Sequence, residues 1–416
     1  MGNFAITGGN RLRGEVEVQT SKNAVLPLMA AAVLTGEPVR LRRCPAIADV
    51  RNMGEILTGL GCEVSREGED LIIDAGPADR CEMPTGPAKE LRSSIFLLGP
   101  MLGRFGRAVV AYPGGCDIGL RPIDLHLKGL ACLGAEISEQ GGAIVCDGRK
   151  MRGGLVHLDF PSVGATENIM MAAVRAKGRT RILNAAKEPE IADLQAMLNR
   201  MGARVYGAGC STVEIEGVEE LHGVEFRPIP DRIAAGTLMI ACAMCGGEIL
   251  LKNVIPEHLS SLIFKLRESA CKITLFDDKI RIAADGRPRN VHKVETSPYP
   301  GFPTDLQAQY LALLTVGEGT GMILETIFET RFKHAAELIR MGADITVRDR
   351  IAMVRGVERL HGAEVRAHDL RGGAALVLAG LAAEGETVVR DIGHIDRGYE
   401  RLEDTLSALG GNIRRT

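Results

Sequence analysis

The sequence has no tryptophan, and its aromatic residues make up only 4% of 416 residues. Few rings are therefore available to stack on bases, which is the usual way of holding single-stranded nucleic acid. The net charge is only −3, and no long run of like charge occurs. Affinity for nucleic acid or anionic membranes normally rests on such basic clusters. We therefore expect neither a nucleic-acid partner nor a membrane partner.

Long apolar runs are also missing. The longest, such as residues 374–383, fall far short of a membrane span, and the first residues lack the apolar core of a signal peptide. Ten cysteines in such a chain favour a reducing, cytoplasmic location over a disulfide framework. Cys242 and Cys245 have C-x-x-C spacing, but their apolar surroundings predict core packing rather than a zinc or redox site. No metal-ligand cluster and no Walker A motif is evident.

The sequence does contain a signature that recurs six times: Leu or Met, Gly, a small residue, a polar residue, then Val or Ile. The copies start at Leu60, Leu133, Met201, Met341 and Leu409, with a degenerate copy at Ser269. Their second residue recurs after 73, 68, 68, 72 and 68 residues. A fixed period of this kind predicts repeated supersecondary units.

Each signature closes an amphipathic helix and starts a strand, with its glycine as the helix C-cap. Each repeat also contains a second helix that is apolar nearly all round and is therefore predicted to be buried. These helices are expected at residues 22–34, 91–102, 166–176, 232–245, 305–316 and 370–383. Six units of strands plus two helices predict an α/β protein with two domains of three repeats.

Polar residues gather near the starts of these buried helices: Lys22, Asn23, Arg92, Thr166, Glu167, Asp231, Arg232, Asp305, Asp369 and Arg371. Helix N-termini attract phosphates and carboxylates. Any one of these residues, taken alone, is better explained as an N-cap or a surface charge. Their recurrence at matching repeat positions favours an anion-binding cleft.

A glycine-rich turn follows the apolar strand predicted at residues 108–111. Pro113, Gly114 and Gly115 place Cys116 on a flexible loop, and Pro122 is predicted to open the next helix. The nearby Arg121 and the helix start would favour a reactive thiolate. The local sequence alone leaves open the alternative of a half-buried cysteine, which is the commoner case.

Several long motifs, in order along essentially the whole chain, resemble the UDP-N-acetylglucosamine 1-carboxyvinyltransferases, enolpyruvyl transferases of peptidoglycan synthesis. The matching stretches are residues 8–16, 21–27, 113–126, 162–168, 188–191, 230–232, 299–309, 325–332, 369–373 and 396–401. The resemblance implies a two-domain inside-out α/β barrel of six βαβαββ-type units, with the active site in the interdomain cleft. Residues 21–229 would form one domain, carrying the Cys116 loop, and residues 1–20 plus 230–416 the other.

The implied reaction transfers the enolpyruvyl group of phosphoenolpyruvate to the 3′-hydroxyl of UDP-N-acetylglucosamine and releases phosphate. It is the first committed step of peptidoglycan synthesis and takes place in the cytoplasm. It needs a proton donor, a base for the sugar hydroxyl and cations, but no metal or redox cofactor. The partners implied are the two small-molecule substrates.

The same resemblance implies the roles of individual residues. Cys116 matches the proton donor, which can form an adduct with phosphoenolpyruvate and is alkylated by fosfomycin, and Asp305 matches a candidate base. The residues matching the phosphoenolpyruvate site are Lys22, Asn23, Arg121 and Arg397, of which Lys22 and Arg397 are also expected to be catalytic. Those matching the UDP-sugar site are Arg92, Arg121, Pro122, Ile123, Asp124, Leu125, Ser162, Val163, Gly164, Asp305 and Ile327. A supporting charged set is Arg331, Asp369 and Arg371.

Two other functions compete with this interpretation. Enolpyruvylshikimate-phosphate synthase shares the architecture, but Asn23 and the loop of Cys116 argue against it. A catalytically idle, UDP-sugar-binding regulatory paralogue is disfavoured because Lys22, Cys116, Asp305 and Arg397 are all present.

Overall fold

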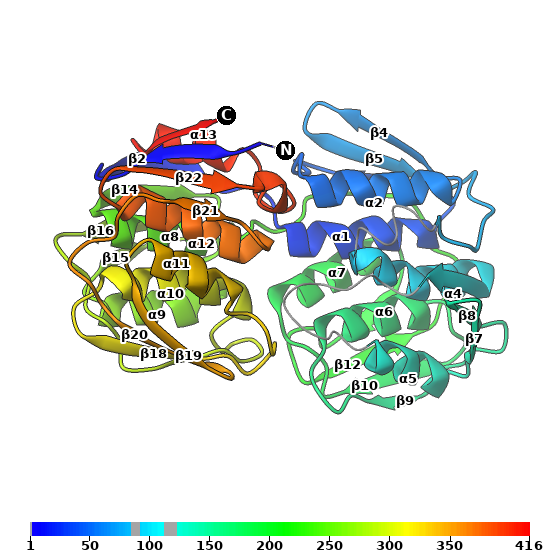
Figure 1. The fold of residues 1–416 in the computed structure, drawn as a ribbon. Helices are drawn as coiled ribbons and strands as arrows, with labels where there is room; N and C mark the ends of the chain where they lie inside the picture. The colour runs from blue at the N-terminus through cyan, green and yellow to red at the C-terminus, as the bar shows by residue number, and fades with distance from the viewer. Residues whose placement is uncertain (1, 85–91, 112–122) are drawn as a thin grey trace. The chain divides into compact units, whose positions relative to one another are not determined.

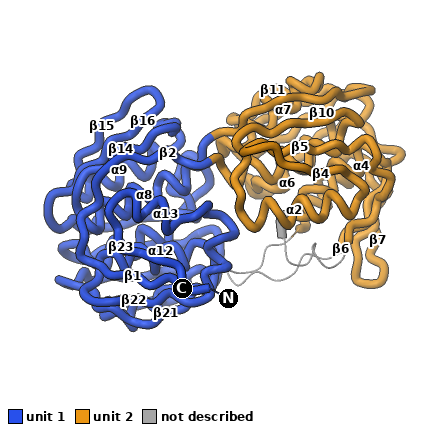
Figure 2. Tube along the Cα trace, turned by 90° about the horizontal axis from the view of Figure 1, so that it is seen from above, with its two compact units in different colours: residues 1–19, 117–120, 230–416 blue, residues 20–116, 121–229 orange. Residues whose placement is uncertain are grey.

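The computed structural model describes residues 2–84, 92–111 and 123–416 and separates into two compact units (Figure 2). Unit 1 holds residues 2–19 and 230–416, and unit 2 holds the described residues from 20 to 229. Each unit has a hydrophobic core of its own. The chain thus begins in unit 1, passes through all of unit 2 and then completes unit 1.

The strands of unit 1 form three four-stranded sheets, each built from four elements in the same spatial order. In that order, the sheets are β2 (Leu12–Glu17), β14 (Gly247–Lys252), β16 (Lys279–Ala284) and β15 (Lys272–Leu275); β17 (Val294–Glu295), β18 (Thr320–Leu324), β20 (Ile351–Arg355) and β19 (Asp344–Arg348); and β21 (Glu364–Arg366), β22 (Glu386–Arg390), β1 (Phe4–Thr7) and β23 (Asn412–Arg415). In each, the first pair is parallel and the other two pairs are antiparallel.

The sheets of unit 2 repeat this order. They are β13 (Val224–Phe226), β3 (Val39–Leu41), β5 (Asp70–Asp74) and β4 (Glu63–Glu67); β9 (Leu155–His157), β10 (Arg179–Leu183), β12 (Thr212–Glu216) and β11 (Arg204–Tyr206); and β6 (Arg107–Ala111), β8 (Ala143–Asp147) and β7 (Glu136–Gln140). In the last sheet, a parallel bridge from Glu82 to Val109 takes the place of the first strand. The structure therefore confirms the predicted α/β fold of six βαβαββ-type repeats, three in each unit.

The apolar helix of each repeat is buried, as its sequence pattern predicted. These helices are α1 (Lys22–Ala31, continued by the 3-10 turn η1, Ala32–Leu34), α4 (Leu98–Phe105, preceded by η2, Arg92–Leu97), α6 (Val163–Ala173), α8 (Arg232–Cys245), α10 (Gln307–Val316, preceded by η4, Thr304–Leu306) and α12 (Leu370–Ala382). In unit 1, α8, α10 and α12 pack against one another with the sheets around them (Figure 1). Small residues permit the close approach: a Cβ on Gly236 of α8 would lie 2.7 Å from Cδ1 of Leu306.

The amphipathic helix of each repeat ends at its signature. These helices are α2 (Ala48–Gly59), α5 (Asp124–Cys132), α7 (Pro189–Arg200), α9 (Ser260–Glu268, preceded by η3, Pro256–Leu259), α11 (Lys333–Arg340) and α13 (Leu402–Ala408, preceded in the chain by η5, Ile392–His394). The signature glycines have φ between 89° and 99°, in the left-handed region that ends helices. They follow the C-cap residue, which is Leu60 in α2, so their predicted placement at the C-cap itself was wrong by one residue. Ala270 adopts the same conformation without being glycine, with φ 72°.

Cys242 and Cys245 lie in α8, the first fully buried and the second partly so, and both are free thiols. Burial raises the pKa of each to about 12, so neither is a ready thiolate. Core packing is thus what the structure gives them, as predicted. Within the described residues, no helix combines the length and apolar character that a membrane span requires.

Candidate active site

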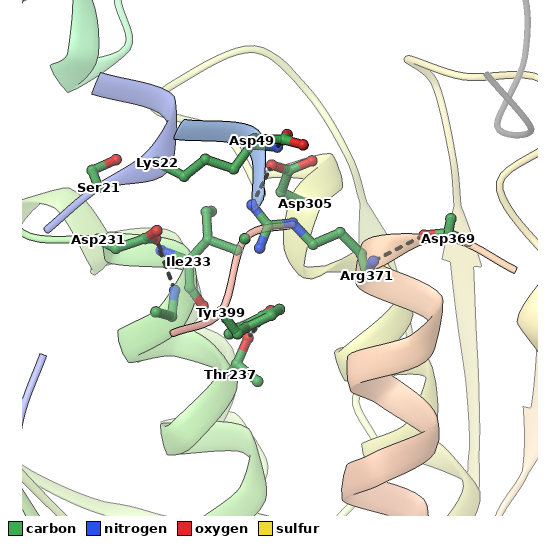
Figure 3. Close-up of polar contacts among 12 residues, drawn as sticks. Ser21, Lys22, Asp49, Asp231, Ile233, Thr237, Asp305, Asp369, Arg371 and Tyr399 are labelled. Carbon is green, nitrogen blue, oxygen red and sulfur yellow. Dashed lines mark hydrogen bonds and ion pairs between the residues drawn. The ribbon is translucent and has the colours of Figure 1, made fainter. Parts of the chain in front are cut away.

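In unit 1, the carboxylate of Asp305 is held by two buried arginines. Its Oδ1 accepts a hydrogen bond from Nη2 of Arg331 at 2.8 Å. Its Oδ2 accepts one from Nη2 of Arg371 at 2.9 Å, which Figure 3 shows. Both arginine side chains are only 3% exposed, whereas that of Asp305 is 25% exposed. Two charge-assisted hydrogen bonds fix the orientation of a carboxylate that solvent or a ligand can still reach.

The start of α12 places Arg371. Asp369 is the N-cap of this helix, and its Oδ1 accepts hydrogen bonds from the backbone N–H groups of Arg371 and Gly372, each at 2.9 Å. Burial opposes the charge of Arg371, but Asp305, Tyr399 and Asp231 together outweigh it and hold the pKa of the guanidinium above its ordinary value. The sequence-predicted set Asp305, Arg331, Asp369 and Arg371 is therefore one connected group.

Glu325 organises the segment that contains Ile327. Its fully buried carboxylate accepts hydrogen bonds from the hydroxyls of Thr296 and Thr304, both at 2.9 Å, and from the backbone N–H groups of Ile327 and Phe328 at 2.8 and 3.1 Å. Because Thr304 precedes Asp305, this carboxylate ties the predicted sugar contact Ile327 to the predicted base. Glu325 lies within the matching stretch 325–332, but no role was predicted for it.

In unit 2, an ion pair orients Lys22 at the start of α1. Its Nζ lies 2.9 Å from Oδ2 of Asp49, whose side chain is only 1% exposed. Ser21 is the N-cap of α1, and its hydroxyl accepts a hydrogen bond from the N–H of Ala24. Asn23 follows Lys22 and is half-buried. Asp49 was not predicted, since nothing in the local sequence of α2 marks it as a partner of Lys22.

The starts of α5 and α6 are joined through His126 and Asn168. The side-chain amide of Asn168 lies 2.8 Å from Nδ1 of His126, donates to the carbonyl of Ile95 at 2.7 Å and accepts from the N–H of Gly99 at 2.6 Å. A Cβ on Gly164 would lie 3.0 Å from Cε1 of His126. Burial lowers the pKa of His126 to about 4, so the ring is neutral at neutral pH.

The predicted UDP-sugar residues Ile123, Asp124 and Leu125 are therefore adjacent to the predicted stretch 162–164. Ile123 and Ser162 are the N-caps of α5 and α6. The neighbouring His126 and Asn168 were not predicted as site residues. Both lie within matching stretches, His126 in 113–126 and Asn168 in 162–168. No local sequence signal distinguishes a buried histidine or asparagine of this kind from other helix residues.

For the remaining predicted residues, the structure gives a position in the chain only for Arg92 and Arg397. Cys116, Arg121 and Pro122 lie outside the described residues, and Arg92 opens η2. Arg397 is half-buried in the segment between η5 and α13 of unit 1. Across the described ranges, no group of three or more His, Cys, Asp or Glu side chains is arranged to hold a metal ion.

The family model for EPSP synthase (3-phosphoshikimate 1-carboxyvinyltransferase) matches residues 6–406. Curated proteins named UDP-N-acetylglucosamine 1-carboxyvinyltransferase are similar over their whole length. The one numbered 2 from Caldanaerobacter subterraneus subsp. tengcongensis is 53% identical and covers 100% of both chains. That from Myxococcus xanthus is 49% identical and that numbered 1 from Staphylococcus aureus N315 is 48% identical, each over 100% of this chain and 99% of the relative.

Solved structures agree on the fold. The enolpyruvyl transferase NikO from Streptomyces tendae has a TM-score of 0.89 at 26% identity and covers 100% of this chain and 99% of its own. EPSP synthase from Acinetobacter baumannii has a TM-score of 0.76 at 17% identity and covers 100% of both chains. The second likeness shows the fold alone.

Proposed function

Because the chain belongs to the family of UDP-N-acetylglucosamine 1-carboxyvinyltransferases, we propose that it transfers the enolpyruvyl group of phosphoenolpyruvate to the 3′-hydroxyl of UDP-N-acetylglucosamine. The observation that carries this proposal is the full-length identity of 48–53% with proteins of that name. The reaction would serve peptidoglycan synthesis in the cytoplasm. It would need no cofactor, because phosphoenolpyruvate is a co-substrate.

The proposed chemistry is an addition followed by an elimination. The sugar oxygen bonds to C2 of phosphoenolpyruvate while its proton passes to a base and another proton is added to the C3 methylene. A proton is then lost from C3 as the bond between C2 and the phosphate oxygen breaks, which restores the double bond and releases phosphate. The site must supply an acid, a base and cations for the phosphate and carboxylate.

Asp305 is the proposed base for the sugar hydroxyl. Each carboxylate oxygen accepts one hydrogen bond from an arginine, which leaves further lone pairs for a substrate proton. The partial exposure of this side chain beside two buried guanidinium groups supports that role. Arg331 and Arg371 would then hold the base in place, and Asp369 would hold the start of the helix that carries Arg371.

The proposed binding sets follow the resemblance. Lys22, Asn23, Arg121 and Arg397 would contact phosphoenolpyruvate. The proposed UDP-sugar contacts are Arg92, residues 121–125, residues 162–164, Asp305 and Ile327. The adjacency of the starts of α5 and α6 supports the second set, and the ion pair of Lys22 with buried Asp49 supports an oriented cation in the first.

Cys116 is the proposed proton donor and the proposed site of a covalent phosphoenolpyruvate adduct. Fosfomycin should alkylate it, and incubation of the protein with drug and UDP-N-acetylglucosamine should add the drug's mass to the peptide containing Cys116. Cys116→Asp should retain activity and resist the drug, because a carboxylic acid can still donate a proton. A wild-type peptide that stays unmodified would contradict this assignment.

The overall proposal is tested by inorganic phosphate release from phosphoenolpyruvate. We expect release with UDP-N-acetylglucosamine and none without an acceptor. A folded protein that binds the UDP-sugar but releases no phosphate would be the idle paralogue instead.

A further inference from the structure

We propose that Tyr399 is a positioning residue: its hydroxyl anchors the segment carrying Arg397 to α8 and α10, and its ring supports Arg371. This inference rests on the proposed function for its kinetic consequence and on unit 1 alone for its geometry. Tyr399 is only 3% exposed, and the starting residues of three buried helices meet around it (Figure 3).

A hydroxyl has one proton to donate, and this fixes the direction of the hydrogen bond between Thr237 and Tyr399. The hydroxyl of Thr237 donates its one proton to the carbonyl of Ile233, at 2.8 Å. It must therefore accept from the hydroxyl of Tyr399, which lies 2.8 Å away. Nε2 of Gln309 lies 3.1 Å from the hydroxyls of both Tyr399 and Thr237 and also from the carbonyl of Asp305. One buried network thus joins Tyr399 to the backbone of the proposed base.

The ring of Tyr399 faces the arginine that holds the same base. The guanidinium carbon of Arg371 lies 5.4 Å from the ring centroid, within the range of a cation–π contact. Arg371 in turn donates to Oδ2 of Asp305. Tyr399 is therefore linked to Asp305 in two ways: through Gln309 to its backbone carbonyl, and through Arg371 to its carboxylate.

A second anchor holds the backbone of the two residues that flank Tyr399. The side-chain amide of Gln19 donates to the carbonyl of Gly398 at 3.0 Å and accepts from the N–H of Glu400 at 2.9 Å. The segment bearing Arg397 is thus held on both sides of Tyr399. Removing the hydroxyl frees one of these anchors and leaves Thr237 and Gln309 short of a partner, while the ring below Arg371 stays.

The test is Tyr399→Phe, with Tyr310→Phe as its matched control. Tyr310 is also fully buried in unit 1, and its hydroxyl also has two partners, the hydroxyl of Ser269 at 3.0 Å and the carbonyl of Lys265 at 3.2 Å. Both variants should lose comparable thermal stability. Only Tyr399→Phe should raise the KM for phosphoenolpyruvate, by about tenfold, with the KM for UDP-N-acetylglucosamine changed by less than about twofold.

Thr237→Val provides a second test, since it removes the acceptor of the same hydrogen bond. It should reproduce the rise in KM, and the double variant with Tyr399→Phe should add little to it. An unchanged KM for phosphoenolpyruvate in Tyr399→Phe, or an equal rise in Tyr310→Phe, would overturn the inference.

Amide hydrogen exchange separates this inference from the proposed function. If the wild type releases no phosphate, the proposed function fails, and exchange at residues 398–400 decides the anchor. Faster exchange there in Tyr399→Phe, but not in Tyr310→Phe, would support the anchor, and equal exchange in both would overturn it.

Discussion

Nη2 of Arg371 lies 2.9 Å from Oδ2 of Asp305, so a guanidinium that is almost fully buried faces a carboxylate that is partly open. Arg371→Lys should lower kcat by about tenfold or more, because an ammonium group on a flexible stem does not reproduce the planar donor geometry. Steady-state phosphate release would measure this. Arg390→Lys, in the exposed pair with Glu364, is the control and should keep its activity. Equal kcat in the two variants would contradict the role of Arg371.

A side chain at Gly164 is predicted to crowd its neighbours. A Cβ there would lie 3.0 Å from Cε1 of His126 and 3.1 Å from Cε1 of Phe96, so in Gly164→Ala these rings must move away by a few tenths of an ångström, which disturbs the starts of α5 and α6. We expect the KM for UDP-N-acetylglucosamine to rise by about tenfold with little change in kcat. Gly54→Ala in α2 is the matched control, since its Cβ would meet only Cγ1 of Val64 at 3.6 Å. An unaffected KM in Gly164→Ala would remove residues 162–164 from the proposed sugar site.

His126 should make stability depend on pH. Its pKa is lowered from 6.5 to about 4 in the folded state, so the neutral ring stabilises the fold fully above pH 6.5 and this contribution is lost as the pH falls toward 4. Between about pH 7.5 and about pH 5 the wild type should lose about 2 kcal/mol more unfolding free energy than His126→Gln. His334, which is also buried with a pKa of about 4, is present in both proteins and cancels. Urea unfolding at the two pH values measures the difference, and parallel losses would contradict the assignment.

Ala270 should be replaceable by glycine with a gain. Its φ of 72° is strained for a residue with a Cβ, and five of the six repeats have glycine at this position. Ala270→Gly should stabilise unit 1 by about 0.5–1 kcal/mol, as measured by the midpoint of thermal or urea unfolding. The reciprocal change Gly342→Ala, at φ 92°, should cost about 1 kcal/mol or more. A loss of stability in Ala270→Gly would show that another contact of Ala270 outweighs its strain.

The repeat could be predicted from the sequence because its signals are local. The glycine at each helix end and the apolar pattern of helices such as α8 need no distant partner to be recognised. Local signals could not predict which strands from distant parts of the chain complete each sheet. β13 completes the sheet of the first repeat, and β1 and β2 complete the sheets of the last repeat and the fourth, all through pairings of large sequence separation.

The site residues likewise fall into those that local motifs predicted and those that only the folded structure pairs. Asp305, Arg331 and Arg371 were predicted from matching motifs, and their hydrogen bonds connect them in the structure. Asp49, Asn168 and Tyr399 received no role because they act through other side chains. Their partners are Lys22, His126 and Thr237, which come from other parts of the chain, so that only the folded structure pairs them.

The central claim is the identity of the acceptor. The most direct measurement places phosphoenolpyruvate, UDP-N-acetylglucosamine and shikimate 3-phosphate in one tube with the protein and follows both acceptors by mass spectrometry. We expect UDP-N-acetylglucosamine alone to gain the mass of one enolpyruvyl group, with one phosphate released for each molecule converted. A gain on shikimate 3-phosphate instead, or on neither acceptor, would contradict it.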